Sequence, residues 1–106
     1  MNSYQILEKE APDVFDAFGT LIKRFQDLPG LDRKTKQLIR IAVLTMQGNA
    51  EGAYLHALMA REAGASRQEV VGAAVLTLSE AGLSKVLTVL PSVIQAFDQA
   101  AGGTKA

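Results

Sequence analysis

Residues Gln47 to Ser66 read QGNAEGAYLHALMAREAGAS, and this stretch decides the fold. Asn49 supplies a side-chain oxygen of the kind that accepts from the free N–H groups at the start of a helix. Glu51 follows in the first turn, where the helix dipole favours an anion. Gly64 suits the left-handed residue that closes a helix. The spacing therefore predicts a helix between Asn49 and Gly64, and this helix carries the only histidine of the chain, His56.

Helical spacing of apolar residues continues on both sides of this helix, and no segment alternates as a strand would. Upstream, Pro12 suits the first turn of a helix that the stretch Leu28-Pro-Gly-Leu31 ends. Asp32 can cap the next helix, which is apolar round nearly its whole circumference and is therefore expected to be buried. Downstream, Ser66 and Glu69 have the spacing of a capping box, in which each side chain bonds the other's backbone N–H.

The C-terminal third predicts two more helices. The first is expected to end at Gly82, and Ser84 can cap the second. Pro91 lies inside the second pattern and should kink that helix or split it. The first of these helices is expected to bury Val70, Val71, Ala74, Val75 and Leu78. The second is expected to bury Val86, Leu90, Val93, Ile94 and Phe97.

Together these segments predict an all-α protein, an antiparallel bundle of five to six helices joined by short loops. The chain has 106 residues, which suits one domain over 1–106, with a core of about 12–100 and a frayed tail at 101–106. Met46 and Met59 lie on apolar faces and are interpreted as core residues. The row of small residues Ala53, Ala57, Ala60 and Gly64 is interpreted as a site of close internal helix packing, with contact to a second copy as the alternative.

Composition excludes several functions. Eleven basic and eleven acidic residues give a net charge of zero, so we predict no nucleic-acid partner and no membrane partner. The chain has no cysteine and one histidine, so we predict no disulfide, no metal site and no cofactor. The N-terminal residues lack a basic start followed by an apolar run, and no apolar run approaches a membrane span. We therefore expect a cytoplasmic protein.

Three pieces of sequence, taken in order, resemble one family. They are Leu31-Asp-Arg-Lys-Thr-Lys-Gln37-Leu38, the helix that carries His56, and Gly64-Ala-Ser-Arg-Gln-Glu69-Val70 followed by Gly72-Ala-Ala-Val. Their order and spacing are similar to those of the carboxymuconolactone decarboxylase and AhpD-like family, over about Leu31 to Phe97. The resemblance implies an AhpD-like bundle that assembles as a homo-oligomer, commonly a trimer or hexamer.

Redox members of that family use a relay of one glutamate, two cysteines and one histidine. The matching positions here are Gln37, Asn49, Gly52 and His56, so only the histidine is kept. A thiolate is the species that attacks a peroxide or a disulfide, and Asn and Gly offer no substitute. We therefore predict no thiol peroxidase and no disulfide reductase activity.

The decarboxylase branch needs no cysteine, and the resemblance implies a glutamate near the histidine. Glu51 lies five residues before His56, which places the two about 140° apart around a helix. Glu51 is therefore poorly placed to assist His56 within one chain, although it could do so across an oligomer interface. Tyr54 and Arg61 are the other polar residues near His56 in the sequence.

Three functional hypotheses follow from these observations. In the first, the protein binds a small molecule near His56 without cysteine chemistry. In the second, it is an active decarboxylase-like enzyme on a lactone or β-keto acid, with His56 as an acid or base. In the third, it is a structural or partner-binding homo-oligomer, and His56 is a core residue whose ring is satisfied by Gln37 or by a backbone carbonyl.

Overall fold

A computed structural model describes residues 1–102 of the chain, and the side-chain surroundings of residues 1–99. All regular structure in the described residues is helical, as predicted. The helices are α1 (Ser3–Glu10), α2 (Pro12–Gln26), α3 (Arg33–Met46), α4 (Ala50–Glu62), α5 (Arg67–Val75), α6 (Leu78–Ala81) and α7 (Leu83–Gly102). Six of them have eight residues or more, and α6 is a single turn. The chain divides into two compact units, Met1–Leu31 and the residues from Asp32 onward.

The N-terminal unit consists of α1 and α2. Asn2 and Gln5 form a capping box at the start of α1, and Pro12 is the first residue of α2. Neither helix contains a buried residue. Along α2 the exposed side chains include Val14, Phe18, Leu21 and Phe25. The unit therefore has no core of its own, although the apolar side of α2 is well defined.

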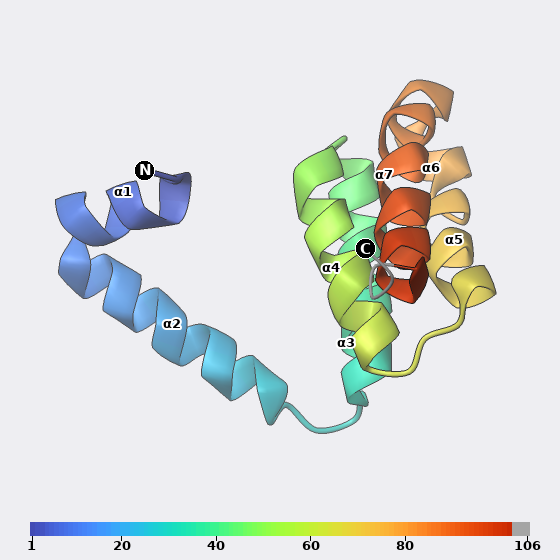
Figure 1. Cartoon of the computed structure of the whole chain (residues 1–106). Helices are drawn as coiled ribbons and strands as arrows, with labels where there is room; N and C mark the ends of the chain where they lie inside the picture. Colours follow the sequence, from blue (N-terminus) through green and yellow to red (C-terminus); the bar gives the residue numbers. More distant parts are fainter. Residues whose placement is uncertain (103–106) are drawn as a thin grey trace. The chain divides into compact units, whose positions relative to one another are not determined.

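The second unit is built on α3, α4, α5 and α7. Figure 1 shows that α3 and α5 run in one direction and that α4 and α7 run in the other. Both α3 and α7 pack against α4 and against α5, so the four helices surround one core. The core residues are Ile41, Ala53, Ala57, Ala60, Ala65, Val70, Ala74, Val89, Val93, Ala96 and Phe97.

Capping signals place the helix starts of this unit as predicted. Asp32 accepts a hydrogen bond from the backbone N–H of Thr35 at 2.7 Å. Ser66 and Glu69 form the reciprocal capping box of α5. Gly64 has a φ of +96°, which fits its predicted role in ending α4.

The small residues of α4 are internal. Ala53, Ala57 and Ala60 are all fully buried in the core, whereas Gly64, the fourth residue of the predicted row, is exposed. Their small side chains let neighbouring helices approach α4 closely, in line with the interpretation of internal packing. These three residues therefore leave no surface for a second copy.

The expectation that the helix after Asp32 is buried on all sides is wrong. In α3 only Ile41 and Thr45 are buried. Ile39, Val43 and Met46 are 45%, 49% and 37% exposed. The helices of this unit cover one side of α3 and leave the other apolar side open. Met59 on α4 is also 39% exposed, so the assignment of both methionines to the core is wrong as well.

The helix after Ser66 is shorter than predicted. It ends at Val75, and the hydroxyl of Thr77 donates to the carbonyl oxygen of Ala74 at 2.7 Å. Such a bond competes with the regular helical pattern, and the chain resumes with the single turn of α6. Val75 and Leu78 are 42% and 41% exposed, so the prediction that both are buried is wrong.

The last helix is continuous across Pro91 and is not split. The proline removes a hydrogen bond to the carbonyl of Leu87, one turn earlier. Pro91 and Leu87 are both exposed, so water can satisfy that carbonyl. Ser84 lies inside α7 and does not precede it. Helix α7 extends through Gly102, and the rest of the tail predicted to fray lies outside the described residues.

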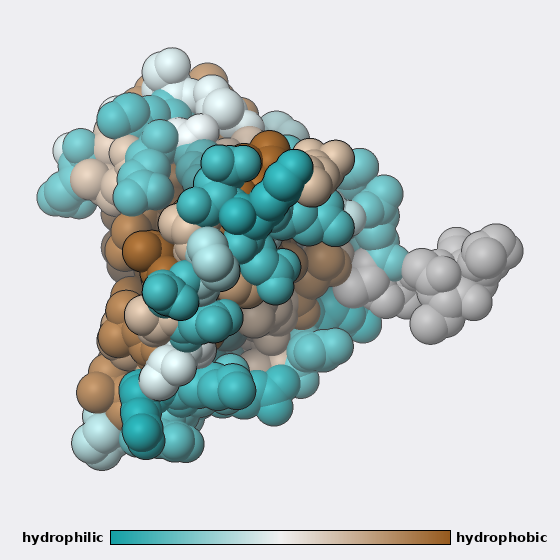
Figure 2. Space-filling model, turned by 90° about the vertical axis from the view of Figure 1, so that its left-hand side faces the viewer, coloured by the Kyte–Doolittle hydropathy of each residue, from teal (hydrophilic) through white to brown (hydrophobic). Residues whose placement is uncertain are grey.

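Many large apolar side chains are exposed at the surface. Figure 2 shows them gathered along one edge of the face drawn. Besides those of α2, α3 and α4, they include Leu76, Leu83 and Leu87, which are 80%, 61% and 57% exposed. Within the described residues, no helix combines the length and apolar character that crossing a membrane requires.

Candidate functional site

The site is a polar contact between two core helices. Helix α3 carries Gln37 and α4 carries His56, nineteen positions apart in the chain. The Oε1 atom of Gln37 and the Nδ1 atom of His56 lie 2.7 Å apart. Gln37 and His56 are two of the four positions that match the redox relay, here called the relay-equivalent positions, and they are neighbours in space. A contact between them is what the third hypothesis, that of a satisfied core histidine, anticipates.

This hydrogen bond determines which of the two ring nitrogens of His56 carries the proton. With Oε1 of Gln37 as acceptor, Nδ1 carries the proton and Nε2 keeps its lone pair. A neutral glutamine fixes the ring without adding a negative charge beside it. The remaining nitrogen of His56 is therefore a base and hydrogen-bond acceptor.

The surroundings of His56 disfavour its charged form. Partial burial lowers the pKa of His56 from its ordinary value of 6.5, and the positive charge of Arg40 on α3 lowers it further. Arg40 follows Gln37 by three residues, so both lie on neighbouring parts of the same helix surface. At neutral pH the site therefore combines a neutral imidazole, a primary amide and a guanidinium.

The other two relay-equivalent positions have structural roles. The side chain of Asn49 accepts a hydrogen bond from the backbone N–H of Gly52 at 2.8 Å and so caps α4. A Cβ atom at Gly52 would lie 3.0 Å from Leu44 Cδ2 and 3.0 Å from Asn49 Nδ2. Glycine at this position therefore lets the capping side chain and α3 pack against the first turn of α4.

The remaining sequence candidates are not joined to His56. Glu51 lies exposed in the first turn of α4, and the hydrogen bond of His56 goes to Gln37 instead. The hydroxyl of Tyr54 donates to Gln99 at 2.8 Å. The guanidinium of Arg61 lies 4.6 Å from the ring centre of Phe97. Tyr54 and Arg61 thus bind α4 to α7 on another side of the helix.

Sequence reasoning missed Arg40 as part of the site. Its spacing of three residues from Gln37 was the available signal, because residues at that spacing are neighbours on a helix.

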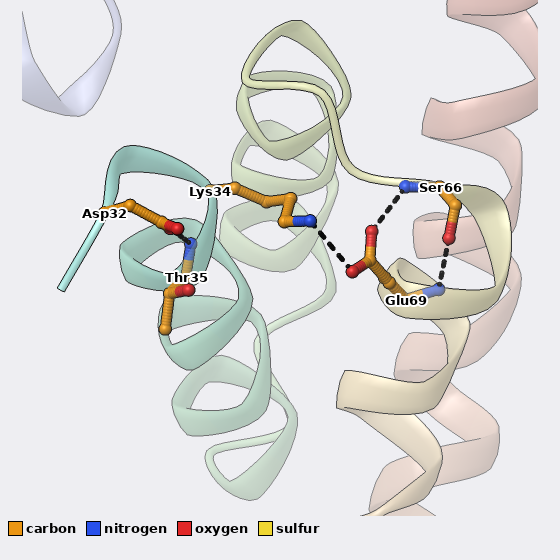
Figure 3. Close-up of polar contacts among 5 residues, drawn as sticks. All are labelled: Asp32, Lys34, Thr35, Ser66 and Glu69. Atoms are coloured by element: carbon orange, nitrogen blue, oxygen red, sulfur yellow. Dashed lines mark hydrogen bonds and ion pairs between the residues drawn. The ribbon is translucent and has the colours of Figure 1, made fainter.

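A second polar cluster, beside the start of α5, ties α3 to α5. Figure 3 shows Lys34 of α3 reaching Glu69 of α5, with an Nζ–Oε2 distance of 3.0 Å. The other carboxylate oxygen of Glu69 accepts from the backbone N–H of Ser66 at 2.9 Å. The pKa of Glu69 is lowered first by that backbone N–H and then by Lys34. The capping box thus also holds two helices together.

No group of three or more His, Asp or Glu side chains that could hold a metal ion occurs in the part of the chain that the structure describes. The model of the carboxymuconolactone decarboxylase family matches residues 10–94. The match covers most of the chain, so the protein belongs to this family. It is a member without cysteine. No curated protein and no solved structure matches the chain.

Proposed function

We propose that this protein is a non-redox member of its family that binds a small molecule at His56. Support comes first from the sequence, because the chain holds no thiol that could attack a hydroperoxide. The position that a glutamate occupies in the redox relay is Gln37 in this chain. The amide of a glutamine cannot take up a proton near neutral pH. Cysteine-dependent turnover of hydroperoxides is therefore not expected of the pure protein.

The contact between Gln37 and His56 carries the proposal. It fixes the imidazole through Nδ1 and leaves Nε2 as the atom that would contact a ligand. Arg40 adds a positive charge close enough to act on the ring. A neutral acceptor beside a cation suits a small molecule that has both a hydroxyl group, which can donate to Nε2, and a negative charge.

The test uses the single histidine as its reporter. Carboxylated lactones are added to the full-length protein, and the NMR signal of the His56 C2–H is followed together with thermal stability. We expect a saturable shift of that signal and a higher melting temperature for at least one compound. His56→Ala should lose the thermal effect, whereas the matched control Glu62→Ala, on the exposed side of α4, should keep it.

Other results would count against small-molecule binding. If none of the compounds moves the His56 signal, or if binding survives in His56→Ala, the site is elsewhere. Tolerance of substitution at His56 without any ligand effect would favour the structural or partner-binding hypothesis.

A decarboxylase-like activity on a lactone or β-keto acid is the second candidate. The lowered pKa of His56 favours it, because a neutral imidazole is available as a general base at neutral pH. The rate of carbon dioxide release should then rise with pH as His56 loses its proton. Turnover that persists unchanged in His56→Ala would contradict this assignment.

A further inference from the structure

The contact between α3 and α4 leaves two polar groups of the site available to a ligand. The hydrogen bond uses Oε1 of Gln37 and the Nδ1–H of His56. Within the described part of the second unit, the amide NH₂ of Gln37 and Nε2 of His56 make no further hydrogen bond. No side-chain nitrogen or oxygen of the described residues is both buried and unpaired. Both groups therefore reach the surface of this unit.

These two groups require opposite properties of a ligand. The lone pair of Nε2 on a neutral imidazole only accepts, so a ligand at His56 must supply a proton. The NH₂ of an amide only donates, so a ligand at Gln37 must supply an acceptor oxygen. The two side chains are in direct contact, so one small molecule can meet both groups. The site thus fits a ligand with a donor and an acceptor on a short chain.

The charge of Arg40 selects among molecules of this kind. Arg40 follows Gln37 by three residues on α3, and its charge acts on the imidazole of His56. A carboxylate is therefore a better acceptor here than a neutral carbonyl, since the guanidinium attracts it. A hydroxyl is a better donor than an ammonium, because an ammonium would place a second positive charge near Arg40.

We infer that the ligand of this site is a short-chain hydroxycarboxylate. Its hydroxyl donates to Nε2 of His56, and its carboxylate accepts from the amide NH₂ of Gln37. The inference rests on the proposed function, because it names the class of small molecule that binds at His56. Keto acids fit less well because they lack the hydroxyl proton, and amino acids fit less well because their donor is charged.

Gln37 then has two roles that a glutamate could not combine. Its oxygen orients the imidazole, and its nitrogen binds the carboxylate of the ligand. A glutamate at this position would keep an acceptor for the Nδ1–H but would offer no donor, and its negative charge would repel a carboxylate. Gln37 is therefore the residue that determines specificity for an anionic ligand.

The first test compares matched ligands on the full-length wild type. Lactate and β-hydroxybutyrate, which differ in the separation of hydroxyl and carboxylate, are titrated while the NMR signal of the His56 C2–H is followed. At least one of them should bind about tenfold more tightly than its O-methyl ether, its amino analogue and its primary amide. Equal binding of a hydroxycarboxylate and its O-methyl ether would overturn the inference.

The tautomer of His56 provides a second measurement. In the free protein, above the pKa of His56, the ¹⁵N spectrum of the ring should show the proton on Nδ1 and a bare Nε2. A proton found on Nε2 instead would overturn the inference, because the acceptor would then be the nitrogen that faces Gln37.

Substitutions test the two binding groups separately. Gln37→Glu should lose hydroxycarboxylate binding while circular dichroism still shows a folded, helical protein. Arg40→Gln should weaken binding about tenfold, because it removes the attraction for the carboxylate. The matched control Arg33→Gln removes the same charge from an exposed position at the start of α3 and should bind as the wild type does. Unchanged binding in Gln37→Glu or in Arg40→Gln would overturn the inference.

Failure of this inference and failure of the proposed function give different results. If carboxylated lactones bind at His56 and no hydroxycarboxylate does, the inference is wrong and the proposed function stands. If neither class of compound moves the His56 signal, both are wrong.

Discussion

At the scale of single residues, the chemistry of the site depends on the protonation of His56. His56 is the only imidazole, and its Nδ1 bonds a neutral amide where the redox relay has a carboxylate. Burial and Arg40 both act against the imidazolium. A partner without charge therefore keeps the ring oriented and leaves it neutral, which suits binding or base chemistry better than proton relay.

Gln37→Glu should reverse this electrostatic balance. A carboxylate in place of the amide would stabilise the imidazolium, so the pKa of His56 should rise. The NMR titration of the His56 C2–H measures this directly. The matched control Gln47→Glu adds the same charge at the end of α3 and should move the pKa less. An unchanged pKa in Gln37→Glu would show that the contact between residues 37 and 56 is not kept in solution.

The lowered pKa of His56 also predicts a pH dependence of stability. Because the folded-state pKa lies below 6.5, the unfolded chain binds a proton first as the pH falls. The free energy of unfolding should therefore decrease from about pH 7 downward, through the interval between the two pKa values. Urea unfolding should show this decrease in the wild type and a flatter profile in His56→Gln. The lowered pKa values of Asp32, Glu69 and Asp98 act at more acid pH.

Among the secondary-structure elements, the starts of α3, α4 and α5 were predictable and the end of α5 was not. Asp32, Asn49 and Ser66 act over three residues, so the sequence contains the whole interaction. The break after Val75 is accompanied by the bond from Thr77 to Ala74, and a threonine at such a position does not by itself signal the end of a helix. Capping side chains therefore fixed these three helix starts, whereas the end of α5 was not visible in the pattern.

The link between α3 and α5 can be divided into its parts by substitution at Glu69. Glu69→Gln keeps the capping box and loses the ion pair, whereas Glu69→Ala loses both. A double-mutant cycle with Lys34→Ala should give only a small favourable coupling energy, because both side chains are partly exposed to water. Added salt should reduce this coupling. Equal losses in Glu69→Gln and Glu69→Ala would mean that the bond from the Ser66 backbone N–H to the side chain at position 69 contributes nothing.

For the molecule as a whole, the family and the helical fold were predictable but the distribution of burial was not. Periodicity showed that α3 is apolar round nearly its whole circumference, yet it could not show that the other helices of the second unit cover only one side of it. The contact of Gln37 with His56 was anticipated as one alternative. Arg40 was not, because its effect depends on how α3 and α4 face each other.

Assembly should make thermal stability depend on protein concentration. An oligomer that unfolds to separate chains is stabilised by mass action, so its melting temperature should rise as the concentration increases. Differential scanning calorimetry over a hundredfold range of concentration measures this. A wild-type melting temperature that stays constant over the same range would contradict assembly through exposed apolar helices.

The three buried alanines of α4 have a consequence for the accuracy of the site. Ala53, Ala57 and Ala60 are fully buried, and packed methyl groups leave little room for a helix to turn or slide. His56 is the residue immediately before Ala57, about 100° from it around the helix, so its direction toward α3 depends on how this packed side of α4 is seated. A larger residue at Ala57 would misdirect the imidazole without touching any ligand. The accuracy with which His56 is oriented thus depends on core residues that have no functional groups of their own.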